Sequence, residues 1–132
     1  PAYSVYLSNT DSNQNIHPLT KAIFGNCIIY NQRTPNALVF SKQDGATFNY
    51  LFDNNIIHNT DISILNVLNN NNFLSNNIKD PEFINPNYNA NRLSVKETSP
   101  AKNSGKAEYA NLFPTDYNGN NRQTSPTIGA FQ

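Results

Sequence analysis

Short apolar runs alternate with asparagine-rich turns from the start of the chain to about Asp80. Residues Gly25–Ile29 (GNCII) are matched by Asp53–Ile57 (DNNII) and again by Ser75–Lys79 (SNNIK). These copies begin at positions 25, 53 and 75, so the repeat intervals are 28 and then 22. None of the runs has the 3.6-residue periodicity of an amphipathic helix. Repeats with periods of about 20–50 residues are typical of solenoids, and short β-prone runs favour strands. The pattern therefore predicts an all-β chain folded as a parallel β-helix.

Equivalent residues of successive coils are expected to stack about 4.8 Å apart. In the first two copies Phe24 matches Phe52, and His58 takes the place of Tyr30. A side-chain amide carries both a donor and an acceptor, so asparagines can hydrogen-bond along the axis while each holds a bend. We expect two such columns, the first made of Asn26, Asn54 and Asn76 and the second of Asn31 and Asn59.

The repeat leaves two alternatives for the interior of the coils. Either Ile28, Ile56 and Ile78 or the neighbouring Ile29 and Ile57 point inward. The segment Asp61–Leu68 is compatible with a short helix or with another strand, and Asn69–Asn72 indicates a loop. After Asp80 the repeat stops, and prolines divide the remainder into short pieces. Solenoids need a terminal unit of different sequence. We predict one domain, with the last coils in residues 1–79 and a C-terminal capping segment in residues 80–132.

Five ordered elements in this second segment carry a resemblance to a known family. They are Asp80-Pro81-Glu82-Phe83, then Arg92-Leu93, then Ser99-Pro100-Ala101 ending at Gly105, then Asp116, Gly119 and Arg122 at fixed spacing, and last Ile128-Gly129-Ala130-Phe131. Together they resemble the C-terminal segment of choice-of-anchor Q domain proteins, bacterial members of the pectate-lyase-like superfamily. Two positions depart from that pattern: Thr127 replaces a common Asp, and Gln132 replaces a common Glu. The departures affect a terminal salt bridge and leave the expected fold unchanged.

The resemblance implies a right-handed parallel β-helix that is secreted or carried on the bacterial cell surface, in Bacteroidetes-like bacteria. Its relatives include polysaccharide lyases, whose reacting residues lie on middle coils that no position here matches. The preceding coils of the same protein are then a direct partner of this chain. Structural roles are implied for Asp80, Pro81, Phe83, Ser99, Pro100, Gly105, Asp116, Gly119, Arg122 and Gly129.

Composition changes this picture mainly by excluding partners. The nine acidic and nine basic residues cancel, so the chain lacks the basic excess that nucleic acid or an anionic membrane would attract. No apolar run approaches the roughly 20 residues of a spanning helix, so direct membrane insertion is not expected. Pro1 and the absence of Met indicate a mature form or a fragment. Charged residues make up only 14%, whereas asparagine supplies 26 of the 132 positions.

The candidate chemistry is sparse. The loop from Asp116 to Arg122 contains oxygen ligands suited to Ca²⁺, but it lacks the other acidic residues of a calcium loop, and we interpret it as a structural turn in which Arg122 can pair with Asp116. His17 and His58 lack the spacing of a zinc site, Cys27 is interpreted as a buried hydrophobe, and no cofactor is expected. The aromatic candidates for carbohydrate contact are Tyr3, Tyr6, Tyr30, Tyr50, Tyr88, Tyr109 and Tyr117.

These observations favour a non-catalytic β-helix end of a surface protein that binds or processes polysaccharide. The alternatives are a fragment of a polysaccharide lyase or glycoside hydrolase that contributes to its active site, an adhesin-like binding protein, and an unrelated β-sandwich. A sandwich would show no stacked asparagines, so the asparagine columns discriminate between the two folds.

Overall fold

Strands make up most of the regular structure. The computed structural model describes residues 3–60, 73–74, 81–84 and 93–132. Its elements in chain order are β1 (Val5–Ser8), β2 (Ile23–Gly25), β3 (Ile28–Ile29), β4 (Leu38–Ser41), β5 (Leu51–Asp53), β6 (Ile56–Ile57), β7 (Phe73–Leu74) and one six-residue helix, α1 (Ala107–Leu112). The chain is therefore predominantly β, as the sequence predicts.

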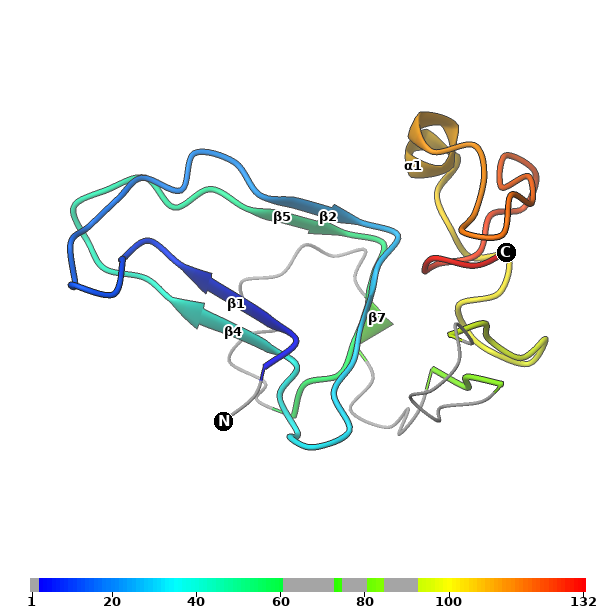
Figure 1. Ribbon diagram of the computed structural model, residues 1–132, viewed down its shortest axis with the longest axis horizontal. Coiled ribbons are helices and arrows are strands. Elements are labelled where there is room, and N and C mark those ends of the chain that lie inside the picture. Colours follow the sequence, from blue (N-terminus) through cyan, green and yellow to red (C-terminus); the bar gives the residue numbers. More distant parts are fainter. Residues whose placement is uncertain (1–2, 61–72, 75–80, 85–92) are drawn as a thin grey trace.

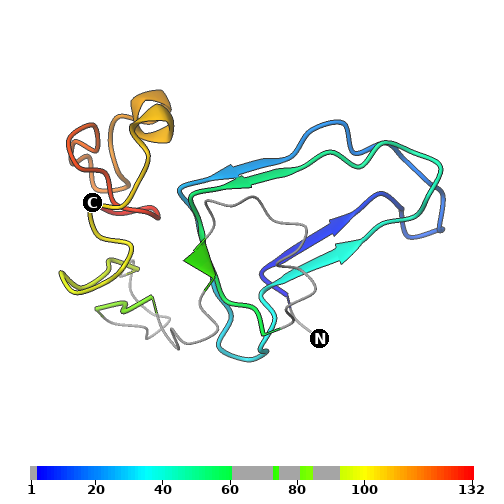
Figure 2. The same cartoon turned by 180° about the vertical axis from the view of Figure 1, so that it is seen from behind.

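The first three strands pair with the next three in the same order, and every pair is parallel. The chain passes through β1, β2 and β3, returns, and runs alongside itself through β4, β5 and β6 (Figures 1 and 2). Ile23 lies opposite Leu51 and Ile28 opposite Ile56, so these partners are separated by the repeat interval of 28, as Asn26 and Asn54 are. The first repeat interval in the sequence is thus confirmed as the register of β2 on β5 and of β3 on β6.

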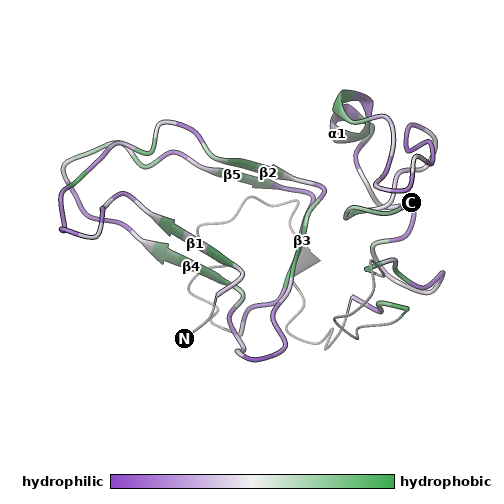
Figure 3. Ribbon diagram, viewed as in Figure 1, coloured by the Kyte–Doolittle hydropathy of each residue, from purple (hydrophilic) through white to green (hydrophobic). Residues whose placement is uncertain are grey.

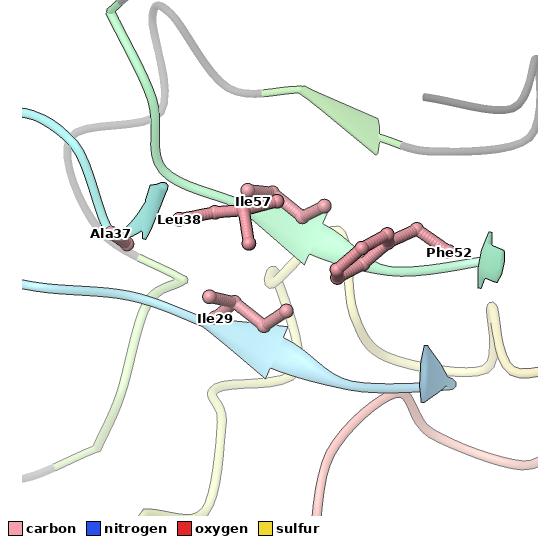
Figure 4. Packing of buried hydrophobic residues seen from close by; sticks show 5 residues of the cluster. All are labelled: Ile29, Ala37, Leu38, Phe52 and Ile57. Carbon is pink, nitrogen blue, oxygen red and sulfur yellow. The ribbon is translucent and has the colours of Figure 1, made fainter. Parts of the chain in front are cut away.

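Apolar side chains from both passes form the main core, shown in Figure 4 and composed of Ile29, Ala37, Leu38, Phe52 and Ile57. Removing a large apolar side chain from water stabilises the fold by about 1.5–3 kcal/mol. The rings of Phe24 and Phe52 stack at 4.6 Å with an angle of 1° between their planes. Hydrophobic residues gather on the strands and polar ones on the connections (Figure 3).

The two isoleucine columns have different surroundings. Ile29 and Ile57 belong to the main core, whereas Ile28 and Ile56 belong to a second cluster that includes Val95, Ala101 and Ile128 from the C-terminal part of the chain. Each of the two isoleucine columns that the sequence left open thus contributes to an apolar cluster. One column fills the space between the strands, and the other packs against the C-terminal part.

The third sequence copy does not supply the third strand. β7 pairs with β6 through Phe73, opposite Ile56, and Leu74, opposite Ile57. Ile78, which we expected to stack on Ile56, lies outside the described residues, and the position opposite Ile56 is taken by Phe73. Strands in a parallel sheet favour apolar residues, such as the Phe73–Leu74 pair of β7. The third sequence copy was chosen mainly for its asparagines, and in so asparagine-rich a chain such a match is a weak guide to a strand. Asn76 and Asp80, like the ambiguous segment Asp61–Leu68, lie outside the described residues.

The first asparagine column exists between the two described copies. Asn54 Nδ2 donates to Asn26 Oδ1 at 2.8 Å, and both residues hold the left-handed backbone, with φ of 56° and 52°. Asparagine tolerates this conformation better than most residues, because its short amide bonds locally. The second column does not form as predicted: the amide of Asn59 instead accepts from Leu38 N–H at 2.9 Å and donates to Leu38 O at 3.0 Å. These two bonds occupy both the donor and the acceptor of the Asn59 amide.

Candidate functional site

The C-terminal segment, residues 93–132, attaches to the side of the strand pairs (Figures 1 and 2). We call this segment the tail, and residues 25–28, where β2 turns into β3, the corner. Asn26 Nδ2 donates to Lys106 O, and Asn26 Oδ1 accepts from Lys106 N–H, both at 2.9 Å. Asn54 Nδ2 also donates to Ser104 O at 2.8 Å, and Gly129 N–H donates to Asn26 O at 2.8 Å. The tail thus contacts both passes of the chain, and we call this contact the seam.

A charged cluster closes the seam. Lys106 Nζ lies 2.6 and 2.8 Å from the two carboxylate oxygens of Asp53, and Tyr109 OH donates to Asp53 Oδ2 at 2.9 Å. Desolvation, together with the hydrogen bond to Asp53 and its charge, raises the pKa of Tyr109 to about 12. A phenol with so high a pKa is a poor general base at neutral pH. The cluster therefore serves attachment rather than proton abstraction.

Several residues that the resemblance marked as structural contact one another. Ser99 Oγ donates to the carbonyl of the fully buried Pro81 at 2.7 Å and accepts from Ala101 N–H at 3.1 Å. Phe83 forms a β-bridge with Val95 and packs against the second cluster. Pro100, which follows Ser99, is partly buried.

Two glycines of the tail are required by close approaches. A Cβ on Gly105 would lie 2.8 Å from Pro126 O, and one on Gly129, whose φ is +109°, would lie 3.0 Å from Ile28 Cδ1. The backbone oxygen of Pro126 leaves no room for a side chain at Gly105, and the positive φ of Gly129 is a conformation that residues with a Cβ rarely adopt. The two glycines thus let the tail lie directly against itself and against the corner.

The predicted pair of Asp116 and Arg122 is wrong. The carboxylate of Asp116 accepts four hydrogen bonds, from Asn118 N–H, Asn120 N–H, Asn120 Nδ2 and Gln132 N–H. Arg122 Nη2 instead donates to Thr127 O at 3.0 Å and to Gly129 O at 2.7 Å. Burial acts to raise the pKa of Asp116, but these hydrogen bonds outweigh it and lower the pKa. Because these four donors already occupy the carboxylate of Asp116, the guanidinium of Arg122 bonds to backbone carbonyls instead.

The loop of Asp116 has a twin that the sequence reasoning missed. Asp11 accepts from Asn13 N–H, Asn15 N–H and Asn15 Nδ2, as Asp116 does from Asn118 and Asn120. Hydrogen bonds from Asn15, joined by one from His17, lower the pKa of Asp11 to about 2. Both loops follow the spacing Asp-x-Asn-x-Asn, a signal that could have been found. In both loops the aspartate carboxylate accepts the hydrogen bonds that hold the turn together.

The fourth positions of the twin loops give a matched prediction. Gln14 has φ of 66°, whereas its counterpart Gly119 has φ of 83°. Replacing Gln14 by Gly removes the left-handed strain of a residue with a Cβ, which outweighs the greater chain entropy of glycine, and should stabilise the fold by about 0.5–1 kcal/mol. The reverse change, Gly119→Gln, should destabilise by a similar amount in urea denaturation. Equal effects of the same sign would contradict this account of the loops.

An apolar groove of about 380 Å³ lies between the corner and the tail. The corner contributes Gly25, Asn26, Cys27 and Ile28, and the other walls include Phe83, Leu93, Tyr109, Phe113, Arg122 and Gly129. Burial raises the pKa of the Cys27 thiol, and the hydrogen bond to the backbone of Gly25 and the charge of Arg122 oppose this only in part.

The aromatic candidates that the structure describes divide between partly buried and exposed positions. Tyr50 packs against the core, Tyr109 belongs to the seam, and Tyr30 lies against His58 with ring centroids 5.1 Å apart, as the repeat predicts. Tyr3 and Tyr6 are exposed and lie with their ring centroids 6.0 Å apart and their planes 18° from parallel. The other candidates are Tyr117, which is exposed against Phe131, and Tyr88, which lies outside the described residues.

Within residues 3–60 and the other described ranges, no three His, Cys, Asp or Glu side chains gather as metal ligands would. The helix in that part of the chain is too short to cross a membrane. No model of a protein family matches the chain, and searches of curated proteins and of solved structures find no match.

Proposed function

We propose that this chain is the non-catalytic C-terminal part of a right-handed parallel β-helix in a secreted or surface-exposed bacterial protein. The single observation that carries this proposal is the parallel, in-order pairing of β1, β2 and β3 with β4, β5 and β6. The regular register and the hydrogen bond between Asn26 and Asn54 support it. So does the resemblance of the C-terminal part to choice-of-anchor Q domain proteins. Further coils of the same protein would stack on β1, β2 and β3.

The tyrosine pair supports polysaccharide as the ligand of this β-helix. Tyr3 and Tyr6 leave 38% and 54% of their surfaces exposed on the first pass of the chain. Aromatic faces pack against the apolar C–H faces of sugar rings, and two nearly parallel rings side by side suit an extended chain of sugars. Large aromatic residues exposed together also commonly mark a binding surface. We propose that this surface binds polysaccharide without turnover.

Affinity electrophoresis of the chain in gels containing neutral or acidic polysaccharides tests this proposal. At least one polysaccharide should retard the chain, and Tyr6→Ala should weaken that binding about three- to tenfold, the value of one aromatic stacking contact. Tyr117→Ala removes an exposed tyrosine elsewhere and serves as the control. Retardation by none of the polysaccharides, or equal binding by Tyr6→Ala, would refute polysaccharide contact at this surface. Release of unsaturated uronates, followed by ultraviolet absorbance, would refute the non-catalytic role.

A further inference from the structure

The groove between the corner and the tail has the size and walls of a ligand site. Its volume of about 380 Å³ lies within the range of roughly 300–1,000 Å³ typical of small-molecule pockets. Three aromatic side chains line it, Phe83, Tyr109 and Phe113, together with Leu93 and Ile28. Such walls favour a flat, apolar ligand.

Apolar side chains at the groove are left open to water. Phe113 keeps 69% of its surface exposed and Leu93 keeps 55%. Neither is needed to fill the two buried clusters of the described chain. Exposed apolar groups beside a concave surface are typical of places where a ligand or partner binds.

The groove contains one charged side chain, and that charge has no acidic partner in the described ranges. Arg122 donates through Nη2 to two backbone carbonyls, and it forms no ion pair among the described residues. Its Nε is buried and meets no acceptor in that part of the chain. Arg122 lines the groove together with Cys27 of the corner. A guanidinium beside apolar walls is best satisfied by an anion, and a carboxylate fits its planar array of donors.

We propose that this groove binds an aromatic carboxylate, with the ring between Phe83, Tyr109 and Phe113 and the carboxylate on Arg122. Both features are required: the aromatic walls select the ring, and the uncompensated guanidinium selects the acid over a neutral analogue. The site is separate from the tyrosine pair of the proposed function, because its walls come from the corner and the C-terminal part of the chain.

Calorimetry with 3-phenylpropionate tests the site, and 3-phenylpropan-1-ol is the uncharged control. The acid should bind at least about tenfold more tightly than the alcohol, which corresponds to one charge-assisted hydrogen bond. Because Cys27 is the one cysteine of the chain and lines the groove, bound acid should also slow its reaction with a thiol reagent. Equal affinities, no binding, or unchanged labelling of Cys27 would each overturn the proposal.

Two variants locate the site. Arg122→Gln should abolish the preference for the acid over the alcohol while leaving weak binding of both. Leu93→Ala changes an exposed wall residue with little effect on folding, and it should weaken both ligands alike. Binding that survives both changes would place the ligand elsewhere and overturn the proposal. Polysaccharide retardation through Tyr6 should be unchanged in both variants, so failure of the groove and failure of the proposed function are distinguishable.

Discussion

Replacing Asn26 by Ala should lower the free energy of unfolding by about 3–4 kcal/mol. The change removes three hydrogen bonds, one with Asn54 and two with the backbone of Lys106. Each is worth about 1 kcal/mol, and an alanine in the left-handed backbone costs about 1 kcal/mol more. Urea denaturation monitored by circular dichroism measures the loss directly.

Asn103 provides the control for that experiment. It shares the left-handed backbone, with φ of 56°, but it is exposed and its side chain makes no hydrogen bond within the described residues. Asn103→Ala should therefore cost only the backbone contribution of about 1 kcal/mol. If the two variants lose the same stability, the seam contributes nothing through Asn26.

Replacing Gly25 by Ala should destabilise the seam by about 2–3 kcal/mol through overpacking. An added Cβ would lie 2.4 Å from Cε1 of Tyr109, and that ring is held in place by its hydrogen bond to Asp53. Either the ring or the whole tail must move. Limited proteolysis should then cut the tail faster than in the unmodified chain, and urea denaturation should report the loss of stability.

Removing the ring provides the internal control for this second change. In a Tyr109→Ala background the added methyl group meets no aromatic ring, so Gly25→Ala should cost less than about 1 kcal/mol there, since residues in direct contact show non-additive effects. Additive losses would mean that Gly25 is constrained by something other than Tyr109.

The register of the first two passes could be predicted from the sequence, because it repeats similar residue types. Phe24 on Phe52 and Asn26 on Asn54 are stacks of like residues, and such stacks leave a visible period. The match of Ser75–Lys79 lies outside the described residues, and asparagine is frequent enough in this chain to match by composition alone. The apolar pair Phe73–Leu74 was the better indicator of a third strand.

The seam could not be predicted in this way. Asp53 meets Lys106 and Tyr109 across sequence separations of 53 and 56, and no local period links them. The need for glycine at position 25 likewise depends on a ring that arrives from the tail. The interpretation of Asp116 and Arg122 as a pair failed for a related reason. Sequence spacing shows that the two charges are near each other along the chain. It does not show that backbone N–H groups already occupy the carboxylate of Asp116.

The attachment of the tail to Asn26 also sets the order in which the chain can complete its fold. Lys106 reaches Asn26 from 80 positions further along, and Gly129 from further still. During synthesis the corner asparagines can align with each other early, but Lys106 and Gly129 leave the ribosome only after many further residues have been added. Contacts at such sequence separations are slow to form, because the loop between them must close first. The contacts of Asn26 with Lys106 and Gly129 should therefore form late in folding. Removing residues 129–132 would leave the carbonyl of Asn26 without its hydrogen bond from Gly129.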